Sequence, residues 1–268
     1  TNDYGASWQS ISNGIPDNEF TRIVREDPVR PGLLFVGTET RIYVSTNEGA
    51  TWEPLQLNMP VTPIHDLVVK EGDLVAATHG RSFWILDDLT PLREPICDEE
   101  SNGAHLFRPR QTYRRSPLFN VGARERVGTG KNYHPAAGIA AAYYEVPSRG
   151  GQLDKIYLDA GKDCPDGALI NYYLRDQPDS KISLIFIGQS GDVVGNYSSA
   201  DGGPLTAHPG TNRFVWDMRY PGSKVIEEGT DPVIAGPLVT PGNYRVELRQ
   251  NNTVQTQTLA VCLDPSID

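Results

Sequence analysis

The chain has 268 residues, including 26 glycines and 21 prolines, and its formal net charge is −10. This share of Gly and Pro exceeds the average but stays below the level that signals disorder. We therefore expect a turn-rich, mostly β protein of one or two domains. The acidic balance argues against a sequence-independent nucleic-acid binder and against a polybasic membrane-surface protein. No apolar run approaches the roughly 20 residues that span a bilayer, so no membrane span is expected.

A sequence repeat opens the chain. Residues 1–8 and 45–52 share the pattern Ser/Thr-x-Asp/Asn-x-Gly-x-Ser/Thr-Trp and lie 44 residues apart. Its characteristic positions hold Asp3 and Asn47, Gly5 and Gly49, and Trp8 and Trp52. We expect each copy to form a tight hairpin in which the Asp or Asn oxygen accepts backbone amides, the glycine adopts a positive φ, and the tryptophan packs between adjacent sheets. These residues are interpreted as structural rather than catalytic.

Short strand-like runs follow in chain order. A first set of four is predicted at residues 20–25, 33–36, 41–45 and 52–57. A second set of three is predicted at residues 64–69, 73–77 and 81–86. The two sets align, because the turn at 37–41 matches the turn at 77–81. The second set ends in Asp87 and Asp88 without the Gly and Trp of a complete motif, which is typical of a last unit that closes differently.

The remainder of the chain changes character twice. Residues 93–130 lose regular periodicity and predict a linker, whose basic stretch at 108–115 either pairs with acidic neighbours or forms an anion patch. From residue 131 onward the pattern is that of a β-sandwich, with polar turns between short alternating strands. The predicted strands are 140–146, 168–174, 181–187, 193–197, 211–217, 242–248 and 254–261. A hairpin turn is predicted at 188–192.

These motifs resemble a known family. The repeat, together with residues 78–88, 212–221 and 241–245, is similar to the C-terminal part of large bacterial sialidase-like or sortilin-type proteins, described as glycosyl-hydrolase-like. These carry neuraminidase repeats, also called Asp-boxes. The resemblance implies an all-β chain with β-propeller blades at 1–92, a crossing segment at 93–130 and an immunoglobulin-like sandwich at 131–268. It also implies a secreted, periplasmic or cell-envelope protein.

The number of predicted blades indicates whether this chain can close a propeller by itself. About two and a half blades are visible, whereas closed propellers have about four to eight. We therefore expect the remainder of a longer chain, or another subunit, to complete the propeller.

Ligand-binding candidates come from the topology of the repeat. If the Asp-box joins the third and fourth strands of a blade, the turns between the second and third strands lie at the opposite end, where propellers usually bind ligands. These turns hold Glu39, Arg41, His79 and Arg81. Two arginines at one repeat position are suited to bind an anion jointly. The alternative is that Arg41 and Arg81 begin a strand and pair with neighbouring acids.

Metal and cysteine chemistry are weakly indicated. Asp159, Asp163 and Asp166 concentrate oxygen ligands for Ca²⁺, but they lack an EF-hand pattern, so a solvated loop without metal or other cofactor is favoured. Cys97 and Cys164 lie in polar loops where a disulfide is an open alternative. Cys262 lies in an apolar run and is expected to be a core residue.

Three functions remain open on the sequence alone. The favoured one is a non-catalytic scaffold that recognises a protein or a glycan. The second is the C-terminal part of a sialidase-like hydrolase whose catalytic residues precede Thr1. By resemblance, such enzymes use a Tyr/Glu nucleophile pair and an arginine triad, and this chain offers no complete set. The third is an assembly module that docks another subunit.

Overall fold

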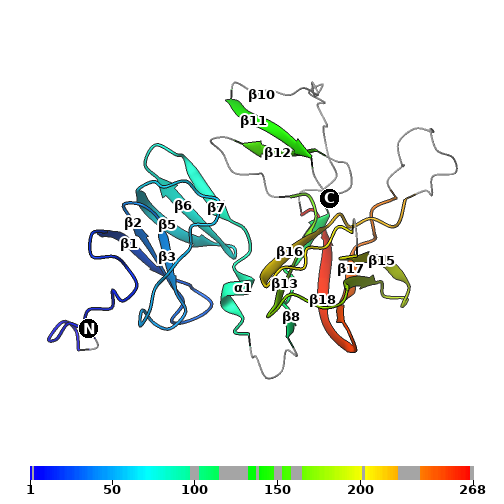
Figure 1. Cartoon of the computed structure of the whole chain (residues 1–268), viewed down its shortest axis with the longest axis horizontal. Helices are drawn as coiled ribbons and strands as arrows, with labels where there is room; N and C mark the ends of the chain where they lie inside the picture. The colour runs from blue at the N-terminus through cyan, green and yellow to red at the C-terminus, as the bar shows by residue number, and fades with distance from the viewer. Residues whose placement is uncertain are drawn as a thin grey trace. The chain divides into compact units, whose positions relative to one another are not determined.

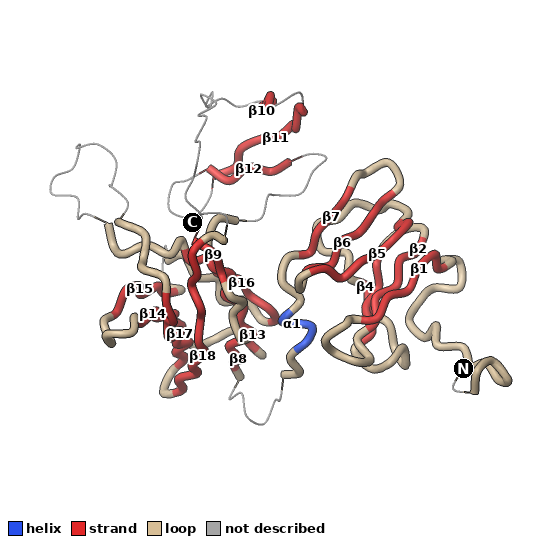
Figure 2. The backbone as a smooth tube through the Cα atoms, turned by 180° about the vertical axis from the view of Figure 1, so that it is seen from behind, coloured by secondary structure: helices blue, strands red, loops and turns tan. Residues whose placement is uncertain are grey.

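The protein is all-β with almost no helix in the computed structural model, shown in Figures 1 and 2. The structure describes residues 1, 3–96, 103–114, 132–136, 139–147, 153–157, 165–200, 203–222 and 236–265. Two compact units divide the chain, and the boundary falls between Arg93 and Glu94. They are called the N-terminal unit and the C-terminal unit below, and each is described by itself.

The N-terminal unit contains two antiparallel sheets. The first sheet has the order β1-β2-β3-β4, and its strands are β1 (Thr21–Glu26), β2 (Leu34–Thr38), β3 (Ile42–Ser45) and β4 (Glu53–Pro54). The second sheet has the order β5-β6-β7, and its strands are β5 (Ile64–Lys70), β6 (Asp73–Thr78) and β7 (Phe83–Leu86). A short helix, α1 (Thr90–Arg93), follows. All seven strands fall on the predicted runs, since each run alternates and is bounded by turn residues.

The two sheets share one strand register. Phe35 pairs with Val44 in the first sheet as Val75 pairs with Ile85 in the second. The β1–β2 and β5–β6 ladders also shift register at the same place, next to Thr21 and next to Ile64. The repeat therefore extends from the turn motif to the whole sheet, bulge included.

Alternation gives each sheet two faces, which are named here for later use. The stacking face of the first sheet carries Phe35, Ile42 and Val44, and the receiving face of the second sheet carries Leu67, Leu74 and Ala76. All six side chains are buried in one hydrophobic cluster. Burial of this kind stabilises by about 1.5–3 kcal/mol for each large aliphatic side chain.

A glycine is required where the sheets meet. A Cβ atom added to Gly37 would lie 2.6 Å from Cγ2 of Ile64 on β5.

The loops between the first two strands differ between the sheets. In the first sheet, Asp27 is buried and accepts the amides of Val29 at 2.9 Å and Arg30 at 2.7 Å. Arg93 Nη2 donates to the same carboxylate at 2.7 Å. Burial raises the pKa of Asp27, but the Arg93 contact and the two amides outweigh it and hold the pKa below 3.8. In the second sheet, Glu71 and Gly72 both have positive φ in a two-residue turn.

The described residues of the C-terminal unit form three sheets. Its strands are β8 (Ala104–Leu106), β9 (Thr112–Arg114), β10 (Asn132–Ala136), β11 (Ile139–Pro147), β12 (Leu153–Tyr157), β13 (Ala168–Leu174), β14 (Ile182–Ile187), β15 (Val193–Ser198), β16 (Gly210–Trp216), β17 (Gly242–Gln250) and β18 (Thr253–Leu263). The strand orders are β16-β13-β8, β15-β14-β17-β18-β9 and β10-β11-β12. The seven strands predicted from residue 131 onward are all present.

One hydrophobic core joins two of these sheets. Ile170 on β13 and Trp216 on β16 lie in the same cluster as Leu184 on β14 and Val246 on β17. The predicted alternation on β14 and β17 is confirmed, because every second residue is buried in this core. The predicted turn at 188–192 is also confirmed: the Gly188 amide donates to the Asp192 carbonyl at 2.9 Å.

Two sequence expectations differ from the structure here. Residues 93–130 were expected to be a linker, but β8 and β9 lie in this range and pair with β13 and β18. Cys262 was expected in the core, but it is a half-buried free thiol, because Leu259 and Val261 take the inward positions of β18. Cys97 and Cys164 lie outside the described residues.

The outer edge of β8 is covered by side chains from β18. Gln255 accepts the Leu106 amide at 2.6 Å and donates to the Ala104 carbonyl at 2.6 Å. Gln257 donates to the Leu106 carbonyl at 3.2 Å. These are the backbone groups of β8 that point away from its partner β13, so the edge is satisfied without a further strand.

Candidate functional site

The second copy of the repeat forms the expected turn between β3 and β4. The Asn47 side-chain oxygen accepts the Thr51 amide at 3.0 Å, and the Ser45 hydroxyl accepts the Gly49 amide at 2.9 Å. Gly49 has a φ of 84°, a conformation that favours glycine. The polar side chains of the motif are thus engaged in closing their own turn.

The first copy makes the same bonds. Asp3 accepts the Ser7 amide at 2.9 Å, and the Thr1 hydroxyl accepts the Gly5 amide at 2.7 Å. The hydroxyl and amide of Ser7 lower the pKa of Asp3 to about 2. Gly5 has a φ of 93°. In both copies, therefore, the polar side chains of the motif bond to the backbone of their own turn.

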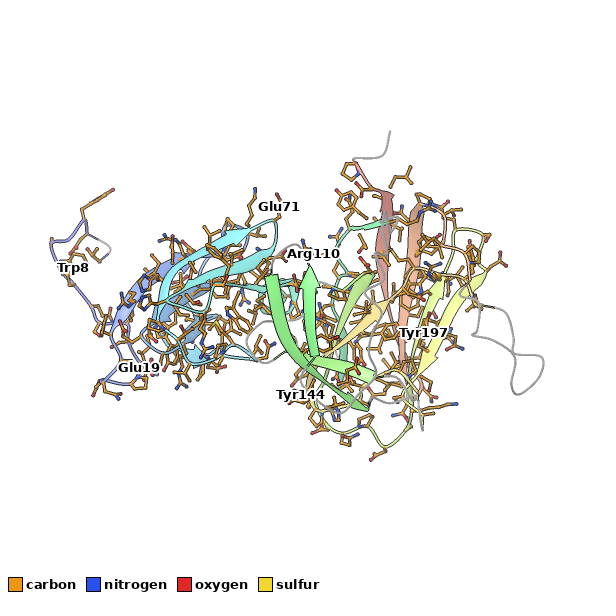
Figure 3. The ribbon with its side chains drawn as sticks, turned by 90° about the horizontal axis from the view of Figure 1, so that it is seen from above. Trp8, Glu19, Glu71, Arg110, Tyr144 and Tyr197 are labelled. Atoms are coloured by element: carbon orange, nitrogen blue, oxygen red, sulfur yellow. The ribbon has the colours of Figure 1, made fainter. Side chains whose placement is uncertain are left out.

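The tryptophans of the two copies behave differently. Trp52 is 5% exposed, packs with Val36 and Tyr43, and donates from Nε1 to the Ile11 carbonyl at 2.6 Å. Trp8 is 80% exposed and lies on the N-terminal segment away from the strands (Figure 3). Trp52 thus packs between the first sheet and the segment around Ile15 rather than between the two sheets of the unit. Trp8 is exposed, so the expected packing between adjacent sheets is found for neither tryptophan.

The candidate ligand residues lie at the opposite end of the strands, as the topology predicted. Thr62 links the two turns that carry them: its amide donates to the Thr40 carbonyl at 3.1 Å, and its hydroxyl donates to the His79 carbonyl at 3.1 Å. The turn between β2 and β3 and the turn between β6 and β7 therefore lie close together. This surface at the two turns is called the turn surface below.

Two of the four candidates are occupied by ion pairs. Arg22 on β1 donates to Glu39. Arg41 lies 3.7 Å from Glu19, whose side chain is 9% exposed. The alternative reading, in which Arg41 pairs with a neighbouring acid, matches this geometry. Joint anion binding by Arg41 and Arg81 would require Arg41 to leave Glu19.

Glu19 also holds the hydroxyl of Tyr43. Thr38 Oγ1 donates to Glu19 at 2.7 Å and Tyr43 donates at 3.2 Å. Burial raises the pKa of Glu19, but the hydroxyl bonds and the Arg41 charge outweigh it and lower the pKa. Burial and the Glu19 bond raise the pKa of Tyr43, which is 2% exposed. The pair is thus a weak base beside a weak acid.

The other two candidates are exposed. The His79 ring stacks on the His65 ring with 5.1 Å between centroids and 21° between planes. Arg81 is exposed, and no described residue pairs with its guanidinium. The turn surface therefore presents two imidazoles and one available cation to solvent.

Sequence reasoning missed Glu19, Arg22 and His65 at this surface. Arg22 and His65 lie near the start of β1 and β5, and their approach to the turns depends on the register shifts there. Glu19 precedes β1 in a loop that carries no periodic signal. The alignment of the two predicted sets of strands could have indicated Arg22 and His65, because it places β1 and β5 beside the β2–β3 and β6–β7 turns.

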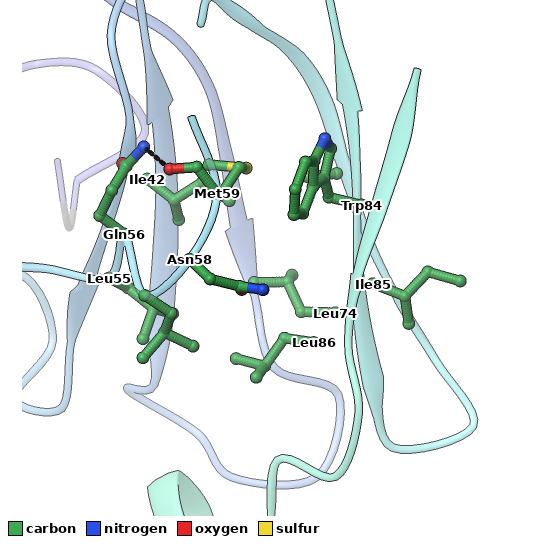
Figure 4. Close-up of a pocket in the computed structure, with 11 residues that line it drawn as sticks. Ile42, Leu55, Gln56, Asn58, Met59, Leu74, Trp84, Ile85 and Leu86 are labelled. Atoms are coloured by element: carbon green, nitrogen blue, oxygen red, sulfur yellow. Dashed lines mark hydrogen bonds between the residues drawn. The ribbon is translucent and has the colours of Figure 1, made fainter. Parts of the chain in front are cut away.

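A small apolar pocket lies beside the second sheet (Figure 4). Its volume is about 50 Å³, and it is lined mainly by apolar side chains that include Leu55, Met59, Leu74 and Trp84. Sites for small organic ligands have volumes of about 300–1,000 Å³. We therefore interpret this pocket as a packing gap between β6–β7 and the segment after β4.

Metal and membrane features are limited. Among the described residues, no three His, Cys, Asp or Glu side chains are grouped to hold a metal ion. Of the Ca²⁺ candidates, Asp166 is exposed, and Asp159 and Asp163 lie outside the described residues. Within the described part of the chain, no helix has the length and apolar character needed to cross a membrane.

Comparisons with known proteins give little further information. No family model matches the chain, and no curated protein matches it. Among solved structures, the extracellular domain of a hybrid two-component system from B. thetaiotaomicron is similar with a TM-score of 0.21 and 11% identity. The match covers 91% of this chain and 31% of that chain, so this chain spans about a third of its length. At this TM-score the likeness carries no argument about fold or function.

Proposed function

We propose that this chain is a non-catalytic scaffold and recognition region of a secreted or cell-envelope Asp-box protein. In this proposal residues 1–92 are blades of a β-propeller, and residues 131–268 form an immunoglobulin-like sandwich. The observation that carries the non-catalytic part is the buried contact between Tyr43 and Glu19.

This contact combines the residue types of a sialidase nucleophile pair with the opposite electrostatics. A tyrosine nucleophile needs a lowered pKa or a strong adjacent base, and it needs access to substrate. Tyr43 is buried with a raised pKa, and the pKa of Glu19 is lowered. Glu19 is moreover held by Arg41. The pair therefore suits a structural link between the loop before β1 and the first sheet.

The repeated sheets support the propeller part of the proposal. Propellers are built from successive antiparallel sheets, typically of four strands, that pack face to face. The first sheet here has four strands and the second has three. The first sheet and the second sheet share a register and a bulge, and they bury one common cluster. The repeat turn at 45–52 joins β3 to β4, and this position agrees with the one that the family resemblance implies for an Asp-box.

A tyrosine contact supports the sandwich part. Tyr244 lies near the start of β17, and its hydroxyl donates to the Thr240 carbonyl at 2.5 Å. A tyrosine that bonds back to the backbone a few residues upstream is a recurrent feature of immunoglobulin-like sandwiches. The single core shared by two sheets agrees with this architecture.

The turn surface is the proposed recognition site. Arg81 is the available cation there, and His65 and His79 add a stacked polar surface beside it. A guanidinium pairs with a carboxylate in bidentate geometry. The favoured ligand is therefore an acidic glycan or an acidic protein segment.

Binding to a panel of sialylated and neutral glycans tests the recognition proposal. We expect the chain to retain acidic glycans and Arg81→Ala to lose them. Lys70→Ala is the matched control, because Lys70 is an exposed cation at the opposite end of the same sheet. Equal binding by Arg81→Ala and the unchanged chain would remove the turn surface from the proposal.

A hydrolysis assay on sialosides and β-glucans tests the catalytic alternative. We expect no turnover above buffer. Turnover that is lost in Tyr43→Phe, Arg41→Ala or Arg81→Ala would overturn the non-catalytic reading and favour the hydrolase.

A further inference from the structure

The five-stranded sheet of the C-terminal unit has an outer face with little negative charge. Its strands β9, β14, β15, β17 and β18 contain a single acidic residue, Glu247, although the whole chain has 34 acidic residues and a net charge of −10. Val246 on β17 packs into the core, so Arg245, Glu247 and Arg249 lie on the opposite, outer face, because successive side chains of a strand alternate. This face therefore carries a local excess of positive charge on an acidic protein.

Glu247 pairs with both arginines. Its side chain is only 9% exposed, although it lies on the outer face of the sheet. Arg249 donates to Glu247 Oε2 from Nε at 3.1 Å and from Nη2 at 2.7 Å. On the other side, Arg245 Nε lies 3.0 Å from Glu247 Oε1. Both carboxylate oxygens are thus used, and the two guanidiniums are held on either side of one buried carboxylate.

The two arginines keep most of their hydrogen-bond donors. A guanidinium has five N–H groups, and Glu247 engages only Nε of Arg245 and Nε and Nη2 of Arg249. The side chains of Arg245 and Arg249 are 56% and 49% exposed. Because two cations share one carboxylate, the group of three has a net charge of +1. Its remaining N–H groups are therefore available to an anion from solvent.

Uncharged polar side chains surround this group. β17 is the central strand of the sheet (Figure 2), and its neighbours place hydroxyl and amide groups on the same face. By register, Thr256 lies directly opposite Glu247, and Thr258 lies directly opposite Arg245. Ser183 on β14 and Asn196 on β15 lie on the other side of β17. Hydroxyl and amide groups both donate and accept hydrogen bonds, which suits the many hydroxyls of a glycan.

We propose that the outer face around Arg245 and Arg249, called the arginine face below, binds the sulfate ester groups of a sulfated glycan. A sulfate ester has three terminal oxygens and one negative charge, so it can accept from both guanidiniums and neutralise the net charge of +1. A carboxylate has two oxygens in one plane and is satisfied by a single guanidinium. The arginine face lies in the C-terminal unit, so this proposal does not depend on the ligand proposed for the turn surface.

Glu247 is a positioning residue in this proposal. Long side chains such as arginine lose rotamer freedom when they are fixed by a ligand, and this loss weakens binding. Because Glu247 already holds Arg245 and Arg249, most of that freedom is lost on folding rather than on binding. The arginine face should therefore bind sulfate esters more tightly than the same number of unrestrained surface cations would.

Calorimetric titration with a short dextran sulfate tests the proposal. The parent for this experiment is the whole chain with Arg81→Ala, so that the turn surface does not contribute. We expect the parent to bind dextran sulfate, to bind carboxymethyl dextran of the same length and charge at least about tenfold more weakly, and not to bind unmodified dextran. Arg245→Ala and Arg249→Ala should each weaken dextran sulfate binding at least about tenfold, because each removes charge-assisted hydrogen bonds. Arg108→Ala is the matched control, since Arg108 is exposed in the same unit but lies outside this sheet.

Lysine variants separate guanidinium geometry from charge. Arg245→Lys combined with Arg249→Lys keeps a charged partner for Glu247 but loses the planar donor groups. This variant should also bind dextran sulfate more weakly than the parent and should lose the preference for sulfate over carboxylate. Equal binding of dextran sulfate by the lysine variant and the parent would overturn the proposal. A parent that ignores dextran sulfate, or that binds the two charged dextrans equally, would overturn it as well.

Discussion

The N-terminal unit repeats two features, a turn motif and a sheet, and the copies of each have the same local structure in different surroundings. The motif turns at 1–8 and 45–52 close with the same hydrogen bonds, and the two sheets share one register. Yet Trp52 is buried and Trp8 is exposed, and the stacking face is covered in the first sheet, while Phe83 on the equivalent face of the second sheet is exposed. The comparison teaches that the motif determines the turn, whereas the neighbouring segments determine what the motif stabilises.

The largest expected difference concerns the tryptophans. Trp52→Ala should lower the free energy of unfolding by about 4 kcal/mol, because it empties a packed site and removes the bond to the Ile11 carbonyl. Trp8→Ala should change it by less than about 0.5 kcal/mol. Both changes in the free energy of unfolding can be measured by urea unfolding, with hydrogen exchange of the β3 amides as the probe. Similar effects in the two variants would show that Trp8 packs in solution.

The second prediction concerns the loop that only the first sheet has. Asp27→Asn should destabilise by about 3 kcal/mol, because it leaves the partly buried Arg93 without its charged partner. The pKa of Asp27 is held below 3.8, so this contribution is present above about pH 4 and declines as the pH falls further. Unfolding of both proteins across pH 2–7 checks the size and the trend.

Asp66→Asn is the control for that measurement. Asp66 pairs with Arg25 across the sheets, but both side chains are substantially exposed. Exposed pairs contribute about 0–1 kcal/mol, so this variant should remain close to the unchanged protein. A loss as large as that of Asp27→Asn would contradict the importance assigned to burial.

A smaller difference is expected between the turn glycines. Replacing either glycine by alanine should lower the free energy of unfolding by about 1 kcal/mol, because alanine is strained at a positive φ. Gly49→Ala should cost about 2 kcal/mol in total, because its Cβ would lie 2.8 Å from Ile11 Cδ1, whereas the Cβ of Gly5→Ala meets nothing closer than 3.7 Å. Thermal unfolding of the two variants ranks them, and the reverse order would contradict the packing of Ile11 on the second turn.

The smallest effect is a difference in titration. The pKa of Asp3 is lowered to about 2. The stability that its bonds contribute to the turn is therefore fully present above its ordinary pKa of 3.8, and it is lost as the pH falls through about 2. Asn47 takes the same position in the second turn and does not titrate. NMR should therefore show the Ser7 amide shifting at low pH while the Thr51 amide stays constant. A Ser7 transition near pH 4 would mean that the first turn is open in solution.

Much of the N-terminal unit could be predicted from sequence because its information is local. Alternating runs bounded by turn residues located all seven strands, and the motif predicted the hydrogen bonds of both turns. The exposure of Trp8 could not be predicted in this way. A tryptophan in the motif indicates that a packing partner is expected, but the sequence of the motif does not show which part of the fold provides that partner.

Other features escaped prediction because they depend on distant pairing. β8 and β9 have three residues each, too few to show periodicity, and they join strands far along the chain. The turn surface was located correctly at one end of the strands, but its ion pairs were not assigned. Glu19 reaches Tyr43 and Arg41 from a loop, and no spacing rule relates these positions.

The two glutamines of β18 have a consequence for solubility. A three-residue edge strand such as β8 normally presents unpaired amides and carbonyls that can template the addition of a foreign strand. Gln255 and Gln257 fill those positions with side chains from the same chain. The C-terminal unit thereby protects one sheet edge from aggregation without using charge, proline or an additional strand.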